Sequence, residues 1–346
     1  MSQEKVSRNP EILGAPAENF SRGLLSVELH PDFGPKIEGK VRDNWVVGKF
    51  YERIMVTTDR QSAFDKMICT VPGKGKVLNK LSGFWFENTG DIVPNHMIAV
   101  PHPNLLIARQ AEETLPVEVI VREYMARSST ATSVYHNYQE LGRREIYGIK
   151  FPEGLRANER FPKPIITPTT KAEAGIHDEE LTGEEARDMV DHRFGYGTYN
   201  KAEKAALELF KRAVRYHGER GLILADTKYE FGIDKDGNLM LIDEINTPDS
   251  SRLWLNETYQ ERFETGKNPD TFDKEILRRW LVERGFRGEE GQRVPVVDQE
   301  VIGQMALAYE KPYIMITGKY LPDTPTDPLG LEREIQQAVN TFYSRR

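Results

Sequence analysis

Short β-rich runs dominate the first third of the chain. Residues 37–57 hold two such runs joined at Gly48-Lys49, which predicts an antiparallel hairpin. Further strands are predicted over 96–100, 104–109 and 117–124. Side chains alternate along a strand, so valines share one face of the last run while Glu118 and Arg122 share the other. We expect the apolar face of that strand to pack in a core and its polar face to line a functional site.

Helical spacing becomes more frequent after residue 180. A capping box at Thr182-Gly-Glu-Glu185 predicts a helix over 183–192. An alanine-rich run over 199–217 predicts a second helix, ended by glycines. Shorter patterns predict helices over 76–87 and 130–141, a long Pro- and Thr-rich functional loop over 151–181, and a mostly helical tail over 273–346.

The order of these elements predicts an α+β fold with two lobes and a cleft between them. Residues 1–114 form a small β-rich lobe in this prediction, and the first 20 residues are a flexible arm. Residues 115–346 form a larger α+β lobe that includes the helical tail. A chain of 346 residues can bury such a core without disulfides or zinc.

Composition excludes several classes of protein. The 47 basic and 54 acidic residues give a net charge of −7, which argues against a nucleic-acid partner. The single cysteine, Cys69, excludes an internal disulfide framework and a multi-cysteine metal site, and we expect it to be buried and not nucleophilic. No apolar run approaches the roughly 20 residues of a membrane helix. We expect a cytoplasmic protein without a membrane partner, either a monomer or a homodimer.

The segment 222–254 carries the most specific chemistry. If Asp236-Gly237 forms a two-residue turn, Glu230 lies directly opposite Asp243 on the paired strand. Alternation places Asp226 and Lys228 on the same face as Glu230. Two carboxylates about 5 Å apart repel each other, and a divalent cation offsets that repulsion. Magnesium, which prefers one or two carboxylates together with nucleotide phosphates, fits this pair.

A structural interpretation of this hairpin is equally simple. Glu230 and Asp243 can be solvated surface residues, or Lys228 can neutralise them, and a register shift of one residue would separate them. The segment that follows favours function. Asp249, Ser251 and Arg252 lie just beyond the second carboxylate, and arginine offers a rigid set of donors for phosphate or carboxylate.

Several other basic segments are candidates for anion binding. The run GPKIEGKV (34–41) fails as a P-loop because Val41 stands where Ser or Thr is required, but Lys40 and Arg42 on a glycine-bearing hairpin can still cover nucleotide phosphates. Hydroxyls at 127–130 follow Arg122, and Lys171 lies in the long loop before Asp178. Each of these has a structural alternative as a surface residue or a helix cap.

Seven motifs in order resemble one known family. They are GKVRD (39–43), TTDRQSAFD (57–65), KVLNKLS (76–82), VEVIVREYMARSS (117–129), TPTTKAE (167–173), DTKYEFG (226–232) and DEINTPDSSRLW (243–254). The chain resembles the SAICAR synthetase family, the phosphoribosylaminoimidazole-succinocarboxamide synthases of purine biosynthesis, over about residues 20–325. The insert at 130–170 is similar to the longer form typical of fungi and plants.

The resemblance implies an activity and a fold. ATP, the carboxylate of carboxyaminoimidazole ribonucleotide and L-aspartate give ADP, phosphate and SAICAR, through an acyl phosphate. The implied fold is related to ATP-grasp and kinase-like architectures, with the nucleotide between the lobes. A kinase-like phosphotransferase with the same hairpin is the alternative, and a nucleotide-binding protein without turnover is a second.

The resemblance also assigns site residues. Glu230 and Asp243 match the magnesium-binding acids, and Lys40 and Arg42 match the phosphate-covering hairpin of the ATP site. The implied catalytic groups are Asp226, Lys228 and Lys171. Positions implied to hold the ribonucleotide or aspartate are Arg122, Ser128, Asp178, Asp249, Ser251, Arg252 and Arg278. Arg127 stands where the family usually has glycine, which changes the approach of that loop to a phosphate.

Overall fold

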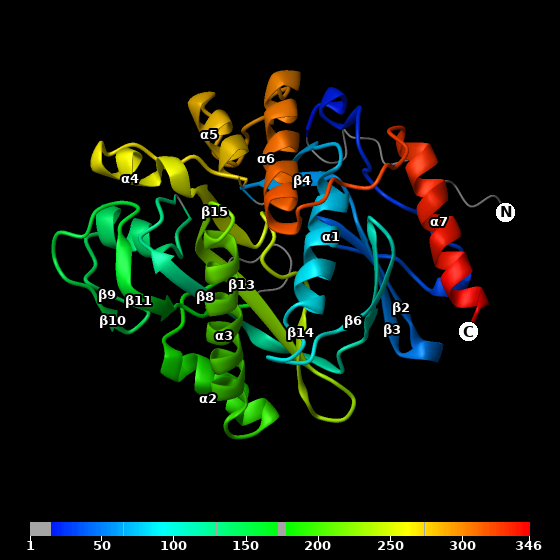
Figure 1. Cartoon of the computed structure of the whole chain (residues 1–346), viewed down its shortest axis with the longest axis horizontal. Helices are drawn as coiled ribbons and strands as arrows, with labels where there is room; N and C mark the ends of the chain where they lie inside the picture. Colours follow the sequence, from blue (N-terminus) through cyan, green and yellow to red (C-terminus); the bar gives the residue numbers. More distant parts are fainter. Residues whose placement is uncertain (1–14, 65, 129, 172–177, 273) are drawn as a thin grey trace.

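The structure is a computed structural model that describes residues 15–64, 66–128, 130–171, 178–272 and 274–346. Two large antiparallel sheets, two small two-stranded sheets and the helices around them form a mixed α/β fold (Figure 1). Among the helices described, none combines the length and the apolar character needed to span a lipid bilayer.

The first sheet has the strand order β1-β2-β3-β7-β6. Its strands are β1 (Ile37–Glu38), β2 (Arg42–Val47), β3 (Glu52–Thr57), β6 (Met97–His102) and β7 (Leu105–Arg109). The predicted hairpin is β2–β3, joined by the short 3-10 helix η4 (Gly48–Phe50). Apolar residues of β2, β3 and β7 pack against Leu331, Ile335 and Val339 of α7 (Pro328–Ser344). The chain's last helix therefore covers the sheet formed by its first strands (Figure 1).

The second sheet has the order β11-β8-β13-β14, and β12 and β15 add to β8 and β13. The bounds are β8 (Glu113–Tyr124), β11 (Arg160–Ile166), β12 (Thr169–Thr170), β13 (Leu222–Ile233), β14 (Leu239–Ile242) and β15 (Ser251–Leu255). Helices α2 (Gly183–Phe194) and α3 (Thr198–Gly218) cover one face. That face carries the predicted valine stripe, Val117, Val119 and Val121, in the main core. The opposite face of β8 and β13 is left for polar side chains.

The remaining elements close the structure around these sheets. They are η2 (Ala17–Phe20), η3 (Pro31–Phe33), β4 (Arg60–Ala63), β5 (Lys66–Thr70), α1 (Lys74–Glu87), η5 (His136–Glu140), β9 (Glu145–Ile146), β10 (Ile149–Lys150), α4 (Asn256–Glu264), α5 (Glu275–Glu283) and α6 (Gln299–Thr317). Helix α1 packs on α6 and on the first sheet. The predicted capping box of α2 is present, with the Thr182 hydroxyl accepting from the Glu185 N–H. Cys69 is buried, as expected.

Three local predictions differ from the structure. The helix predicted over 130–141 is reduced to the π-helical turn η5, because side chains such as Asn137 bond the backbone locally. The segment 151–181 is not one long loop, since β11 and β12 within it pair with β8. Residues 1–14 of the predicted arm lie outside the described residues, while η2 follows them and buries Phe20 in the main core. The domain division at residue 114 stays a prediction.

The register of the β13–β14 hairpin corrects the predicted opposition of Glu230 and Asp243. Glu230 pairs with Ile242, one residue away from the prediction. The loop spans 235–237 because the Asp234 carboxylate accepts the N–H groups of Asp236 and Asn238, at 2.9 and 2.8 Å. Gly237 supplies the left-handed residue that this longer loop requires, at φ 81°. The predicted two-residue turn is therefore wrong.

Candidate active site

A cavity of about 750 Å³ lies between the polar face of the second sheet and the β1–β2 turn of the first. We call it the site cavity. All of the predicted site residues except Ser128 line it, namely Lys40, Arg42, Arg122, Lys171, Asp178, Asp226, Lys228, Glu230, Asp243, Asp249, Ser251, Arg252 and Arg278. Segments more than 200 residues apart in sequence thus meet in one hollow.

Ser128 lines an adjoining cavity of about 370 Å³ that shares Arg252 and Arg278 with the site cavity. Its hydroxyl lies 3.2 Å from the Thr130 hydroxyl, which also accepts a 3.2 Å hydrogen bond from Arg278 Nη1. Arg127 lines the smaller cavity as well and adds a positive charge there. Ser128 and Arg278 therefore belong to the same end of the site.

Asp226 lies between two arginines because three strands run side by side. In the registers of β13 with β8 and β15, Asp226 pairs with both Arg122 and Arg252. Asp226 Oδ2 accepts hydrogen bonds from Arg122 Nη1 at 3.0 Å and Arg252 Nη1 at 2.5 Å. Burial alone would raise the pKa of Asp226, but the two guanidinium groups outweigh burial and lower it. The carboxylate stays ionised and holds both arginines in place.

Lys228 bridges two carboxylates on the same face of the sheet. Glu230 pairs directly with Glu118 of β8, and Lys228 Nζ donates to Glu118 Oε1 and Glu230 Oε1, both at 2.6 Å. The closely opposed carboxylates expected on the hairpin are thus Glu230 and Glu118, with a lysine between them. Burial opposes the charge of Lys228, but Glu230 and Glu118 raise its pKa well above the ordinary value. Lys228 is therefore a fixed cation and not a proton acceptor.

Glu230 also contacts Lys171, which comes from the segment after β12. Burial would raise the pKa of Glu230, but Lys228 and Lys171 lower it to about 2. The pKa of Glu118 is raised, mainly by burial. Lys228 lowers this pKa, but repulsion from Glu230 raises it and offsets that effect. The pair thus contains one strongly acidic and one less acidic carboxyl group.

Asp243 reaches the site cavity although it has left the strand. It follows β14 with a left-handed backbone, at φ 65°. Arg42 of β2 donates from Nη1 to Asp243 Oδ1 at 2.5 Å, and its Nη2 lies 3.1 Å from Glu244 Oε2. Arg42 thus joins the first sheet to the end of β14. Within the described residues, no group of three or more potential ligands is arranged around a metal position.

Asp249 is held by groups that the sequence did not indicate. Lys74 Nζ lies 2.8 Å from Asp249 Oδ2, and the Tyr309 hydroxyl donates to Asp249 Oδ1 at 2.6 Å. Burial would raise the pKa of Asp249, but Lys74 and Lys274 lower it. The pKa of Lys274 is lowered because the effect of burial outweighs the attraction of Asp249, which would raise it. Nearby, Ser251 Oγ lies 2.8 Å from Thr227 Oγ1.

The residues that sequence analysis missed fall into two groups. Glu118 had a visible signal, because the alternation of strand 117–124 placed it on the face of Arg122. Neither alternation nor hairpin register placed Lys74, Lys274 or Tyr309 beside Asp249, since they come from the start of α1, the residue before α5 and the middle of α6. No local pattern shows which helix packs beside the loop that carries Asp249.

The arrangement suits the binding of polyanions. Carboxylates hold five of the cavity's basic side chains in place, so their remaining donors are oriented before a ligand arrives; these are Arg42, Arg122, Lys171, Lys228 and Arg252. Arginine binds phosphate and carboxylate through paired donors. Arg42 contacts Asp243, just after the strand that pairs with β13 at Glu230, whereas Arg122 and Arg252 contact Asp226, on the other side of Lys228 along β13. The cavity can therefore hold two anionic groups on either side of Lys228.

Known proteins share both the sequence and the fold. The SAICAR synthetase family profile matches residues 35–294. A phosphoribosylaminoimidazole-succinocarboxamide synthase of Legionella pneumophila is 47% identical over 299 residues, covering 86% of this chain and 93% of that protein. The SAICAR synthase of Saccharomyces cerevisiae, solved with SAICAR, superposes with a TM-score of 0.72 at 31% identity, covering 87% of this chain and 100% of the yeast chain.

A SAICAR synthetase solved in complex with ADP superposes with a TM-score of 0.61 at 25% identity, covering 84% of this chain and 100% of that one. The match favours the ligase over a kinase-like phosphotransferase. The chain therefore belongs to the SAICAR synthetase family of ligases in purine biosynthesis.

Proposed function

We propose that the site cavity joins L-aspartate to carboxyaminoimidazole ribonucleotide through an acyl phosphate. The ribonucleotide carboxylate attacks the γ-phosphorus of ATP, and ADP leaves. The aspartate amine then attacks the acyl carbon, phosphate leaves, and the nitrogen loses a proton. A carboxylate is a poor electrophile, so phosphorylation supplies the leaving group that amide formation requires. Most of the catalysis is then positioning and charge stabilisation.

The nucleotide phosphates lie at the β1–β2 turn in this proposal. Lys40 and Arg42 line the site cavity there, on a strand pair of the first sheet. A relative solved with ADP supports nucleotide use by the family. The first sheet then acts as a small lobe that covers the phosphates from above the second sheet, as in ATP-grasp and kinase-like proteins. This arrangement brings the γ-phosphate toward Lys228.

Magnesium is the metal that the residues fit. Glu230 and Asp243 both line the site cavity, and hard carboxylate oxygens beside phosphate oxygens are the ligands that this ion prefers. Arg42, Lys171 and Lys228 neutralise the two acids in the structure. When bound, the ion would supply charge for the triphosphate. The protein's part is to keep Glu230 ionised, which its lowered pKa achieves.

The ribonucleotide lies at the opposite end in this proposal. Arg122 and Arg252 are fixed by Asp226 and present their other donors to a carboxylate or phosphate. Ser128 and Arg278 hold the ribonucleotide phosphate near the adjoining cavity. Asp249 and Ser251 complete the contacts to the base and its substituents. The reacting carboxylate then points at Lys228, whose fixed charge stabilises the negative charge that develops on transfer.

L-aspartate enters beside Lys171 and Asp178 in this proposal. Both residues line the site cavity next to Glu230, on the side away from Arg252. Lys171 can attract a carboxylate of aspartate, while Asp178 attracts its amino group. We place the reaction in the cytoplasm, where the chain's single cysteine needs no oxidised partner.

One observation carries the proposal: the Arg122–Asp226–Arg252 cluster and the Lys228–Glu230 pair share one face and one cavity. The test measures ADP release from the intact chain with ATP, magnesium and the ribonucleotide, with and without L-aspartate. We expect sustained turnover and a new amide only with aspartate. Hydroxylamine in place of aspartate should trap a hydroxamate. Sustained ADP release with a stable phosphorylated product and no amide would favour the phosphotransferase instead.

A further inference from the structure

We infer that Arg60 and Lys74 are positioning residues that hold the Lys40 turn and Asp249 in a fixed relation across the site cavity. The inference rests on the proposed function, which assigns the turn to ATP and Asp249 to the ribonucleotide. Both positioning side chains are almost completely buried, with 1% of each residue exposed, so neither is expected to touch substrate.

Arg60 holds the turn through its backbone. Its Nη2 donates to the Gly39 carbonyl at 2.9 Å, and its Nε donates to the Lys40 carbonyl at 3.3 Å. Gly39 and Lys40 themselves are exposed. An exposed turn bonded to a buried guanidinium loses most of its freedom. The Lys40 side chain therefore starts from a fixed backbone when it meets a phosphate.

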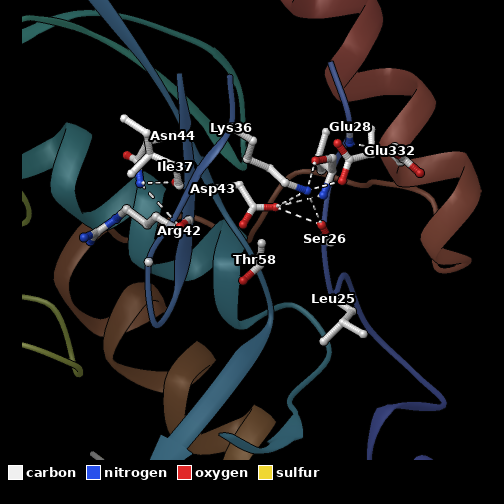
Figure 2. A network of polar contacts seen from close by, with 12 residues as sticks. Leu25, Ser26, Glu28, Lys36, Ile37, Arg42, Asp43, Asn44, Thr58 and Glu332 are labelled. Carbon is white, nitrogen blue, oxygen red and sulfur yellow. Dashed lines mark hydrogen bonds and ion pairs between the residues drawn. The ribbon is translucent and has the colours of Figure 1, made fainter. Parts of the chain in front are cut away.

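Asp43 in its place holds the guanidinium group of Arg60. Its Oδ1 lies 2.8 Å from Arg60 Nη1, and its Oδ2 accepts from the Val27 N–H at 2.9 Å and the Ser26 hydroxyl at 3.1 Å. Figure 2 shows Asp43 directed toward Ser26 and Lys36, whereas Arg42 extends the other way. Alternation on β2 thus sends one residue into the support and its neighbour into the site.

Lys74 connects Arg60 to Asp249, at the ribonucleotide end of the site cavity. Its Nζ donates to the Arg60 carbonyl at 2.8 Å and lies 2.8 Å from Asp249 Oδ2. The Tyr309 hydroxyl donates to Asp249 and lies 2.7 Å from Gln61 Oε1. Two neighbouring residues of β4, Arg60 and Gln61, are therefore linked to Asp249. An unbroken series of polar contacts runs from the Lys40 carbonyl through Arg60 and Lys74 to Asp249.

The consequence is geometric. In-line transfer of a phosphoryl group requires ATP and its acceptor at a set separation, and small misplacements reduce the rate strongly. Both ends of the cavity are bonded to the segment 58–61 and to the first turn of α1. Residues 58–61 of the TTDRQSAFD motif thus act as a common support for both ends of the cavity. This accounts for a motif that the proposed mechanism leaves unused.

The test uses Arg60→Lys and Lys74→Met in the full chain. Lysine keeps the charge but carries its donors on one nitrogen, whereas Arg60 bonds the two carbonyls from Nε and Nη2. We therefore expect the KM for ATP to rise at least about tenfold, with a smaller change for the ribonucleotide. Methionine keeps the length of Lys74 but leaves Asp249 without its cation, so the KM for the ribonucleotide should rise by a similar factor. The matched control is Arg220→Lys, because that guanidinium also bonds backbone carbonyls, those of Ile316 and Tyr216, but lies outside the site cavity.

Lower thermal stability with unchanged KM values for both substrates would overturn the inference, since it would show a purely structural role. If either variant fails to fold, Thr58→Val and Tyr309→Phe replace it. Thr58 Oγ1 donates to the Val41 carbonyl at 2.6 Å, and Tyr309 supports Asp249. These smaller changes should raise the KM for ATP and for the ribonucleotide, respectively, and unchanged values would again overturn it. A Lys40→Ala variant with a normal KM for ATP would instead refute the proposed placement of the ATP phosphates at the β1–β2 turn.

Discussion

Arg42 and Asp243 join the two large sheets, with Nη1 of the arginine 2.5 Å from Oδ1 of the aspartate. Arg42 lies at the start of β2, and Asp243 comes just after β14. The contact neutralises a carboxylate that the sequence assigned to magnesium. Burial alone would lower the pKa of Arg42, but the charges of Asp243 and Glu244 outweigh burial and raise it above its ordinary value. The guanidinium therefore stays charged. A cation that binds Asp243 must therefore compete with Arg42, which links ion binding to the contact between the sheets.

Asp243→Asn should abolish turnover and leave the fold intact. Asparagine keeps the size of the side chain but loses the charge needed for magnesium, so we expect kcat to fall at least about 100-fold. Steady-state kinetics over a magnesium titration measure this effect. Asp236→Asn, on the exposed hairpin loop, is the matched control and should be silent. Near-normal activity of Asp243→Asn would remove the metal role from this residue.

Arg252→Lys should weaken ribonucleotide binding by at least about tenfold, because a point charge does not replace a planar set of donors. Arg252 must bond Asp226 and still reach a ligand. The control is Arg262→Lys, whose guanidinium pairs with Asp270 outside the site cavity. Isothermal titration with the ribonucleotide compares the two variants. Equal affinities would show that Arg252 serves only the fold.

His217 should make stability depend on pH. Burial lowers its pKa to about 4, whereas the unfolded chain titrates near 6.5. Between these values the unfolded state binds more protons, so the free energy of unfolding falls as the pH falls from 6.5 to 4. The loss from this group is about 3 kcal/mol. Urea unfolding at several pH values should show a shallower decline in His217→Gln; identical slopes in both proteins would contradict the assignment.

Gly75→Ala should destabilise the protein by about 1–3 kcal/mol through overpacking. A Cβ at this position would lie 2.3 Å from the Thr57 carbonyl oxygen, where the start of α1 meets the end of β3. The same helix start carries Lys74, so activity should fall as well. Gly303→Ala in α6 is the control, since nothing lies within 4 Å of its added Cβ, and it should be neutral or slightly stabilising. Thermal unfolding of both variants measures the effect, and equal melting temperatures for Gly75→Ala and Gly303→Ala would contradict the prediction.

Local patterns were sufficient for most elements. The hairpin β2–β3, helices α1, α2 and α3, and the valine face of β8 follow from alternation, helical spacing and the capping box. The same alternation correctly put Asp226, Lys228 and Glu230 on one face. It failed at the β13–β14 turn, where bonding by the Asp234 side chain lengthened the loop by one residue. A turn is decided by a few hydrogen bonds, and its sequence was compatible with either length.

The sequence by itself determined which residues alternate, which helices form and, through its ordered motifs, the family and its chemistry. Only the tertiary structure decided that Glu118 opposes Glu230, that Arg42 reaches Asp243, and that Lys74 and Tyr309 support Asp249. The reason is physical. Alternation and helical spacing depend on neighbours a few residues apart, whereas these contacts join sheets and helices whose packing depends on the whole core.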